Sequence, residues 1–310
     1  MLFGNASNLY SMAIYSQPTP AELDQITAKY GLGAIRKLHP FTQGQENSNF
    51  HLVTTAGEYV LTICENKSPV EVERLVNTLT HLANHNFYTT RIVRTLEGAT
   101  HTSWHGKPVL LKTYLAGVVH NPLHPGEHEP LGRALGHLHQ VPPPDFLPTT
   151  LNYGWQTFRP MRAAFAKDHP FLGWLEDFAD YLQPFLTEDL PRALVHGDVF
   201  ADNVVIDPVR GPLIMDFEEA TVYYRLFDVG MTIVGACRTD GQFNREAQAG
   251  LVRGYREVIS LTPAEERALP AFVNYAAAAM ASWRFWQFNV VQPEAGKQEH
   301  YRELQALVKY

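Results

Sequence analysis

Cysteine is scarce in this 310-residue chain, which contains only Cys64 and Cys237. Two cysteines so far apart in the sequence argue against a disulfide framework and against a cysteine-based metal cluster. We therefore expect both thiols to be buried and reduced.

Positive charge and long apolar runs are also limited. The chain has 25 Lys and Arg residues against 32 Asp and Glu residues, a net charge of −7, whereas nucleic-acid binding depends on clustered basic residues. The longest apolar stretch, residues 275–283, is far shorter than the roughly 20 residues of a membrane-spanning helix. Residues 1–17 contain no Lys or Arg and lack the charged region of a signal peptide. We therefore expect a cytoplasmic protein that binds neither nucleic acid nor membrane.

Length and hydrophobic content indicate two domains. At about 150 residues per domain the chain is long enough for two, and 45% hydrophobic residues can supply two cores. We expect an N-terminal lobe of residues 1–115 and a mostly helical C-terminal lobe of residues 116–310.

Local signals predict the elements of the N-terminal lobe. A helix start is indicated where Ser or Thr is followed directly by Pro and, three residues after the Ser or Thr, by Glu. This pattern occurs at residues 19–22, 68–71 and 262–265. Apolar residues at helical spacing extend the second start into a helix over residues 68–84. Strand-like runs cover residues 49–54, 59–64, 92–96 and 108–114, the first two joined by a hairpin turn. Residues 35–115 should therefore form a β-β-α-β-β lobe in an α+β fold, followed by a helix over residues 129–139.

A second hairpin is predicted in the C-terminal half. The apolar runs 204–206 and 213–215 flank a turn that contains Pro and Gly. If the turn is centred between residues 209 and 210, Asn203 and Asp216 lie opposite one another on strands about 5 Å apart. An amide oxygen and a carboxylate placed in this way can hold one divalent cation.

Asp198 lies five residues before Asn203 in a polar loop. A carboxylate beside a metal site can orient a substrate hydroxyl and accept its proton during phosphoryl transfer. The order His196, Asp198, Asn203, followed by a strand that ends in Asp216-Phe217, matches the catalytic loop and the metal-binding Asp of the protein-kinase-like fold.

On these residues the chain resembles the aminoglycoside phosphotransferase and choline kinase superfamily, and within it the bacterial type II homoserine kinases most. The likeness is also carried by residues 44–50, 59–65, 115–117, 135–139 and 261–270. The resemblance implies a protein-kinase-like bilobal fold, with a small β-sheet-plus-helix N-terminal lobe that binds nucleotide. The larger, mostly helical C-terminal lobe would carry the catalytic loop and the acceptor site.

The resemblance also implies roles for residues in ATP-dependent phosphorylation of a hydroxyl. Asp198 would be the catalytic base, Asn203 and Asp216 would bind Mg²⁺, and His196 would support the loop through a hydrogen bond to the backbone near Asp216. ATP would lie between the lobes, with its phosphates under residues 43–49 and its adenine near residues 111–114. The nucleotide contacts expected are Gly44, Asn47, Ser48, Asn49, Thr62, Leu111, Thr113 and Tyr114.

Thr62 occupies the strand position at which this superfamily usually has a phosphate-contacting Lys. Lys67 or Lys112 is a candidate substitute, held by Glu71 or Glu73, and the alternative is that Glu71 is only the capping acid of its helix. Thr62 also permits the hypothesis of a nucleotide-binding pseudokinase, although Asp198, Asn203 and Asp216 are all retained.

Acidic residues directly after Phe217 suggest what the acceptor carries. Glu218 and Glu219 can bind a substrate ammonium group, and Arg238 and Arg284 are candidates for binding the carboxylate of homoserine. The alternative for both arginines is an ion pair with acids of the protein itself. We expect a small-molecule acceptor, homoserine first, giving O-phosphohomoserine for threonine biosynthesis. The alternative acceptors are aminoglycosides, choline, methylthioribose, amino sugars and other amino alcohols. A protein substrate is the least expected. The choice between monomer and homodimer stays open.

Several further residues have structural explanations. Asp228 should cap a helix and, by the resemblance, steady the catalytic loop, whereas Asp202 is left open between solvent and substrate. The aromatic residues of 174–185 and 283–288 should pack the helical lobe, a cage for a quaternary ammonium being the alternative.

Histidines at positions 120, 124, 128, 137 and 139 raise the question of a zinc site. Prolines interrupt the first three, however, and the last two face in different directions on a helix. We expect loop and helix surface there.

Overall fold

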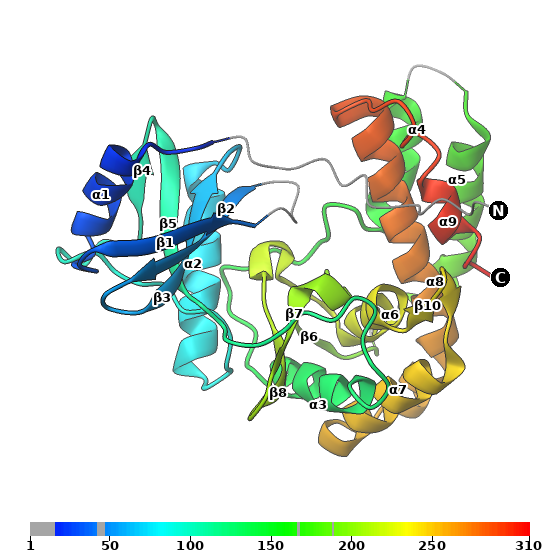
Figure 1. The fold of residues 1–310 in the computed structure, drawn as a ribbon. Helices are drawn as coiled ribbons and strands as arrows, with labels where there is room; N and C mark the ends of the chain where they lie inside the picture. The colour runs from blue at the N-terminus through cyan, green and yellow to red at the C-terminus, as the bar shows by residue number, and fades with distance from the viewer. Residues whose placement is uncertain (1–15, 42–46, 166–167, 188) are drawn as a thin grey trace, which may run out of the picture. The chain divides into compact units, whose positions relative to one another are not determined.

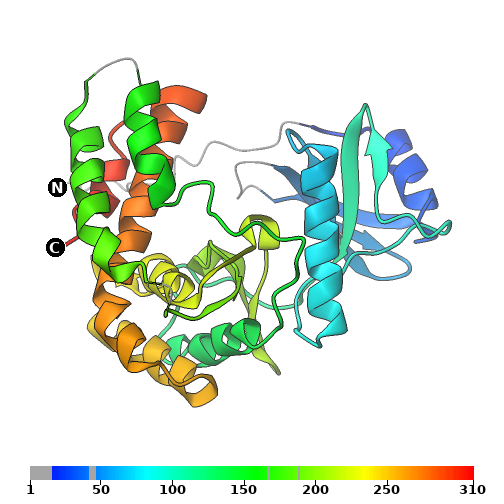
Figure 2. The same ribbon diagram turned by 180° about the vertical axis from the view of Figure 1, so that it is seen from behind.

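The computed structural model describes residues 16–41, 47–165, 168–187 and 189–310. It divides into two compact units, shown in Figures 1 and 2. The first unit holds the described residues up to Asn84 together with Thr89–Leu115, and the second holds His85–Tyr88 and Ala116–Tyr310. Gly44 and most of the predicted phosphate loop lie outside the described residues.

The first unit is an antiparallel five-stranded sheet with the strand order β1-β2-β3-β5-β4. Leu52, Leu61 and Leu111 are fully buried on one face, against apolar residues of helix α1, and helix α2 lies on the other side of the sheet in both views (Figures 1 and 2). The elements are α1 (Pro20–Ala28), β1 (Ile35–Pro40), β2 (Asn47–Thr54), β3 (Glu58–Cys64), α2 (Pro69–Asn84), β4 (Thr102–Trp104) and β5 (Lys107–Thr113).

The predicted strand over residues 92–96 is wrong. Only Ile92 makes an isolated bridge, to Lys112, and the strand beside β5 is β4. Neighbouring backbone groups do pair with β5, since Val93 donates to the carbonyl of Leu111 over 2.8 Å. The edge of β5 is thus shared by two short segments. Strand β1 was not predicted from the sequence. Its residues are mostly exposed and lack the apolar alternation that identifies a strand.

All three predicted helix starts are confirmed. Helices α1 and α8 begin with reciprocal hydrogen bonds between a Thr side chain and a Glu three residues later, and Ser68 makes the same exchange with Glu71. Glu71 is therefore the capping acid of α2. The cap contributes about 1 kcal/mol to a helix start.

The described residues of the second unit are mostly helical, with three short antiparallel strand pairs. Helices α3 and α7 pack together, as do α6 and α8. The helices are α3 (His128–His139), α4 (Phe158–Ala164), α5 (Pro170–Leu182), α6 (Arg225–Ala236), α7 (Arg245–Val258), α8 (Pro263–Trp286) and α9 (Tyr301–Gln305). The strand pairs are β6 (Arg192–Val195) with β9 (Thr221–Tyr224), β7 (Val204–Asp207) with β8 (Gly211–Ile214), and β10 (Arg238–Thr239) with β11 (Gln242–Phe243). No helix in the described ranges is long and apolar enough to span a membrane.

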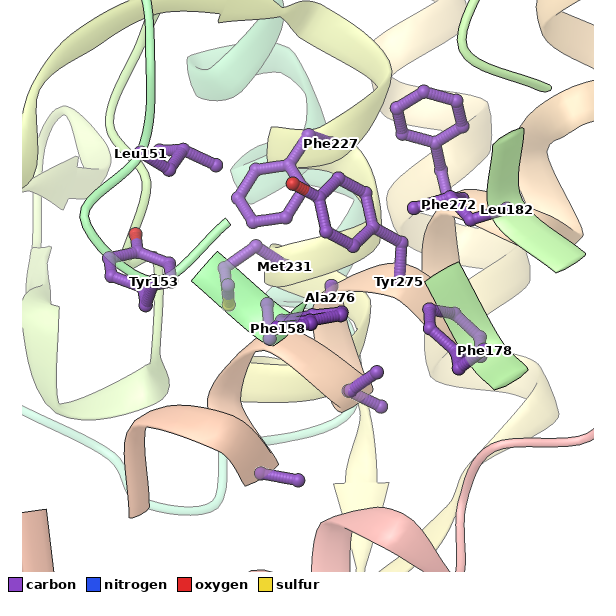
Figure 3. Close-up of a cluster of buried hydrophobic side chains, with 14 of the residues drawn as sticks. Leu151, Tyr153, Phe158, Phe178, Leu182, Phe227, Met231, Phe272, Tyr275 and Ala276 are labelled. Carbon is purple, nitrogen blue, oxygen red and sulfur yellow. The ribbon is translucent and has the colours of Figure 1, made fainter. Parts of the chain in front are cut away.

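An aromatic core fixes helices α6 and α8 (Figure 3). Phe227 of α6 lies 4.8 Å from Tyr275 of α8, centroid to centroid, and neither ring is exposed. The Tyr275 hydroxyl accepts a hydrogen bond from the amide of Trp155 over 3.0 Å, so its polar end is satisfied. The aromatic residues of 174–185 and 283–286 pack against this core, and Phe288 lies against Trp283, so the predicted packing of the helical lobe is confirmed. Both cysteines are buried thiols, also as predicted.

Candidate active site

The loop of residues 196–203 joins β6 to β7, and its start is held by one buried carboxylate. The amide of His196 donates to Oδ2 of Asp228 over 2.7 Å, and the amide of Gly197 donates to Oδ1 over 2.8 Å. Asp228 lies in the first turn of α6 and has no solvent exposure. The prediction that Asp228 steadies this loop is confirmed. The prediction that it caps the helix is wrong, because α6 already begins at Arg225 and Asp228 lies inside its first turn.

A second buried residue completes the support of Asp228. Nε2 of His139 lies 3.1 Å from Oδ2 of Asp228, and Nδ1 of His139 lies 2.8 Å from the hydroxyl of Tyr255. Burial alone would raise the pKa of Asp228, but the hydrogen bonds from His139 and from the His196 amide reverse the effect and lower it. Asp228 therefore stays ionised and can accept from both loop amides.

His196 acts as a link between the loop and strand β8. Its Nδ1 accepts from the amide of Asp198 over 3.1 Å, so Nε2 carries the proton donated to the carbonyl of Met215 over 2.8 Å. Burial lowers the pKa of His196, which agrees with a neutral ring. The predicted hydrogen bond from His196 to the backbone beside Asp216 is confirmed.

Gly197 allows the loop to turn toward Asp198. Its φ is +88°, and a Cβ there would lie 2.8 Å from the hydroxyl of Tyr153. That hydroxyl donates to the carbonyl of Gly197 over 2.7 Å. An L side chain would thus meet both backbone strain and a steric clash.

The hairpin that carries Asn203 and Asp216 is confirmed, but its predicted register is wrong by one residue. Asn203 lies opposite Met215, whose amide donates to the Asn203 carbonyl over 2.9 Å. The turn closes over three residues because Oδ1 of Asp207 accepts from two turn amides and Gly211 adopts a φ of +79°. Asp216 follows β8 after one intervening residue and has a left-handed φ of +68°.

Asp198 and Asn203 are in direct contact. Nδ2 of Asn203 donates to the carbonyl of Asp198 over 2.8 Å and to its carboxylate over 3.1 Å. Burial raises the pKa of Asp198 well above its usual value, and the charge of Asp216 raises it further, followed by the charges of two other acids, Asp202 and Glu219. These acids are therefore close enough to interact.

This donor set suits a divalent cation. The amide oxygen of Asn203 remains an acceptor because its Nδ2 makes the hydrogen bonds to Asp198. Asp216 adds a carboxylate, and hard divalent ions favour such oxygen ligands. A cation would also offset the mutual repulsion that raises the pKa of Asp198.

The predicted acceptor residues differ in their surroundings. Glu219 interacts with Asp198 electrostatically, and both Glu218 and Glu219 lie on the short helix η4 (Phe217–Glu219). Arg238 and Arg284 instead bind opposite oxygens of Glu303, over 2.7 and 3.0 Å. The ion pair with the protein's own acid is thus present, and a role for the arginines in substrate binding stays a prediction.

The predicted nucleotide residues of β2 and β3 form cross-strand contacts. Asn49 lies opposite Thr62, and the Thr62 hydroxyl donates its only proton to Oδ1 of Asn49 over 2.7 Å. Ser48 donates to Glu65 over 2.5 Å, and Asn47 begins β2 opposite Cys64. Their contact with phosphate stays a prediction.

The remaining nucleotide residues lie on or just after β5. Leu111 is fully buried in the sheet core, and Thr113 bonds Arg91 through its amide and its hydroxyl. The Tyr114 ring stacks on His51 at 4.2 Å. A role of these residues in binding adenine also stays a prediction.

Sequence reasoning missed several residues. Lys107, which was not among the predicted lysines, forms an ion pair with Glu65 over 2.5 Å. His139 and Tyr153 support the catalytic loop from distant parts of the chain. The position of Lys107 at the start of a strand was only a weak indication of its ion pair. Nothing in the sequence indicated the contacts of His139 and Tyr153, because their partners lie far away along the chain.

Comparison with known proteins identifies the family. A model of the phosphotransferase enzyme family matches residues 37–269. The chain belongs to this family. It is 29% identical over 294 residues to homoserine kinase of Granulibacter bethesdensis, covering 92% of this chain and 91% of that protein. It is 30% identical over 315 residues to homoserine kinase of Methylocella silvestris, covering 96% of each.

Solved structures show the same fold. The microcompartment-associated aminopropanol kinase has a TM-score of 0.68 and 18% identity, over 92% of this chain and 93% of that one. Amicoumacin kinase hAmiN, in complex with AMP-PNP, Ca²⁺ and amicoumacin, has a TM-score of 0.69 and 15% identity, over 90% and 91%. The fold is protein-kinase-like, with an N-terminal antiparallel sheet and a larger helical part, and the protein is a phosphotransferase that acts on a hydroxyl group.

Proposed function

We propose that this protein transfers the γ-phosphoryl group of ATP to the hydroxyl of homoserine, giving O-phosphohomoserine. The observation that carries the phosphotransfer is the contact of Asp198 with Asn203 beside Asp216, on a loop held by Asp228. The assignment of homoserine as the acceptor rests on the similarity to homoserine kinases, which match over nearly the whole chain. A cytoplasmic location stays a prediction.

Asp198 is the residue that receives the substrate proton. The hydrogen bond from Asn203 fixes the orientation of its carboxylate, so the acceptor hydroxyl is aligned for in-line attack and loses its proton to Asp198. Asp228 positions Asp198 by holding the two preceding amides.

Asn203 and Asp216 would hold the divalent ion, which we assign as Mg²⁺. When bound, such an ion neutralises charge on the transferring phosphoryl group. ATP would contact the first unit through Asn47, Ser48 and Asn49, together with Gly44, Thr62, Leu111, Thr113 and Tyr114 as predicted from the sequence. Relatives with ADP or AMP-PNP in their structures support the choice of nucleotide.

The substrate amine would bind near Asp198. Glu219 is close enough to affect Asp198 electrostatically, and with Glu218 it would bind an ammonium group. The carboxylate of homoserine would bind Arg238 or Arg284, in competition with Glu303.

That competition favours a second candidate, a kinase for amino alcohols that have no carboxylate. Both arginines are already satisfied by Glu303, so such an acceptor would leave this network intact. Aminopropanol and ethanolamine kinases are among the structural relatives.

An acceptor panel separates the two candidates. ADP release would be measured with homoserine, 1-amino-2-propanol, ethanolamine, choline and spectinomycin, and the product identified by mass spectrometry. We expect the highest kcat/KM with homoserine. No turnover of homoserine, with turnover of an amino alcohol, would establish the second candidate instead.

A matched pair of variants tests the carboxylate site. We expect Arg238→Gln to raise the KM for homoserine while leaving that for 1-amino-2-propanol unchanged. Arg256→Gln, which removes an exposed ion pair with Glu266, should change neither value. Equal changes for both acceptors in Arg238→Gln would remove Arg238 from the carboxylate site.

A further inference from the structure

Three metal-binding side chains meet in the segment that leads into α3. His120, His124 and Glu127 each offer a ligand atom, and these atoms all lie within 4.8 Å of one another. The sequence predicted only loop and helix surface here, because prolines interrupt the histidines. The structure shows that the segment folds back on itself, so residues four and seven positions apart come together without a helix.

Glu127 connects the two histidines. One carboxylate oxygen lies 2.7 Å from Nδ1 of His120, and the other accepts from the amide of His124 over 2.7 Å. The amide of Glu127 donates to the carbonyl of His124 over 3.1 Å. These short-range contacts define the geometry of the cluster within eight residues.

We propose that His120, His124 and Glu127 bind a divalent transition-metal ion of the zinc class. Two imidazoles and one carboxylate are a ligand set that Zn²⁺ uses when a fourth position is left to water. Nitrogen ligands favour such ions over Mg²⁺. The half-buried Glu127 and His120 would form the inner side of the site, and the exposed His124 would leave an entry path for the ion.

Only small side-chain movements are required. Zinc–ligand bonds of about 2.0 to 2.2 Å place neighbouring ligand atoms roughly 3.3 Å apart in a tetrahedron. The His120 and His124 rings now stack with centroids 3.8 Å apart and an interplanar angle of 21°. Rotation of the rings away from this stack would direct both nitrogens at one ion, while the His124 amide keeps the carboxylate oriented.

The position of the cluster connects it to two elements of the second unit. Val118 forms an isolated bridge with Ile206 of β7, the strand that follows Asn203. Nε2 of His128 lies 3.2 Å from the carbonyl of Ala236, at the end of α6. Metal binding would therefore stabilise the connection between the edge of β7 and the start of α3.

Direct titration of the full chain with Co²⁺ and then Zn²⁺ tests the proposal, with Mg²⁺ in excess to occupy the oxygen ligands of Asn203 and Asp216. We expect one Co²⁺ per chain with a visible absorption spectrum of nitrogen ligation, displaced by one Zn²⁺ in calorimetry. His120→Asn and His124→Asn should each weaken Zn²⁺ binding by at least about tenfold. The matched control His101→Asn, at an exposed histidine outside the cluster, should bind as the parent does.

Thermal unfolding provides an independent readout. Zn²⁺ should raise the unfolding midpoint of the parent and of His101→Asn. It should leave the unfolding midpoint of the His120→Asn/His124→Asn double variant unchanged. The midpoints measured without metal would show that each variant is folded. Zn²⁺ binding of equal affinity and stoichiometry in the double variant, or no stoichiometric binding by the parent, would overturn the proposal. Neither measurement uses ATP or an acceptor, so the outcome is independent of the proposed kinase activity.

Discussion

His139 and Asp228 form a fully buried pair, with Nε2 of the imidazole 3.1 Å from Oδ2 of the carboxylate. The same carboxylate accepts the amides of His196 and Gly197. Helix α3, which carries His139, is therefore linked to the catalytic loop through one side chain of α6. The start of the loop of residues 196–203 is therefore held by a carboxylate that is itself fixed by His139.

We expect Asp228→Asn to destabilise the protein and to slow turnover. Asparagine offers one acceptor oxygen in place of two, so one loop amide or His139 loses its partner at a cost of about 1 to 3 kcal/mol. Misplacement of Asp198 should then reduce kcat by about 10-fold to 100-fold. Urea unfolding and steady-state kinetics measure the two effects. Asp240→Asn, in an exposed turn, is the matched control, and equal behaviour of the two variants would contradict the positioning role of Asp228.

Gly197→Ala should be more damaging than an alanine at another glycine with positive φ. Both Gly197 and Gly106 lie in the left-handed region, but a Cβ at Gly106 meets nothing within 4 Å whereas one at Gly197 meets the Tyr153 hydroxyl. Gly106→Ala should cost only the backbone strain, about 1 to 2 kcal/mol, and leave kcat unchanged. Gly197→Ala should exceed that loss in urea unfolding and also lower kcat. Equal losses of stability with equal kcat would show that the contact with Tyr153 is unimportant.

Local patterns explain which parts of the fold were predictable. The three Ser/Thr-Pro-x-Glu helix starts and the second hairpin depend on neighbours in the sequence, and all were predicted. The hairpin register failed because one side chain, Asp207, and one backbone angle, at Gly211, set a three-residue turn. A pattern of apolar residues does not contain that information.

The candidate site was predictable only in part, for the same reason. His196, Asp198, Asn203 and Asp216 fall within 21 residues, so their spacing is visible in the sequence. His139 lies 89 residues from Asp228, and its role depends on how α3 and α6 pack. The closeness of His120, His124 and Glu127 was missed because prolines interrupt this segment, so the regular spacing of a helix could not be used to place its side chains.

Stability should depend on pH through Glu265, whose carboxylate is buried and bound by Nε and a second nitrogen of Arg225 over 2.7 and 2.8 Å. Burial opposes ionisation, but the hydrogen bonds from Arg225 and from the Thr262 amide outweigh it and lower the pKa of Glu265 below 4.5. The stabilisation is thus present above the unfolded-state pKa and is lost as the pH falls through the lower folded-state pKa.

Glu265→Ala should therefore cost about 3 to 5 kcal/mol at pH 7, because it leaves the Arg225 charge without its partner. The difference from the parent in urea unfolding should shrink in acid. Glu266→Ala removes an exposed acid that pairs with Arg256, and it should cost less than about 1 kcal/mol. A difference for Glu265→Ala that grows as the pH falls would contradict this assignment.

Turnover of the Asp198→Asn variant is the most direct test of the catalytic site. Asparagine keeps the size of the side chain but cannot accept the acceptor's proton, so we expect kcat to fall by about 10²-fold to 10⁴-fold while ATP affinity in calorimetry is unchanged. Asp240→Asn, an exposed acid in a turn away from this loop, serves for comparison and should retain the parental activity. Parental turnover by Asp198→Asn, with the acceptor that the panel identifies, would contradict the role of Asp198 as the base and with it the account of this site.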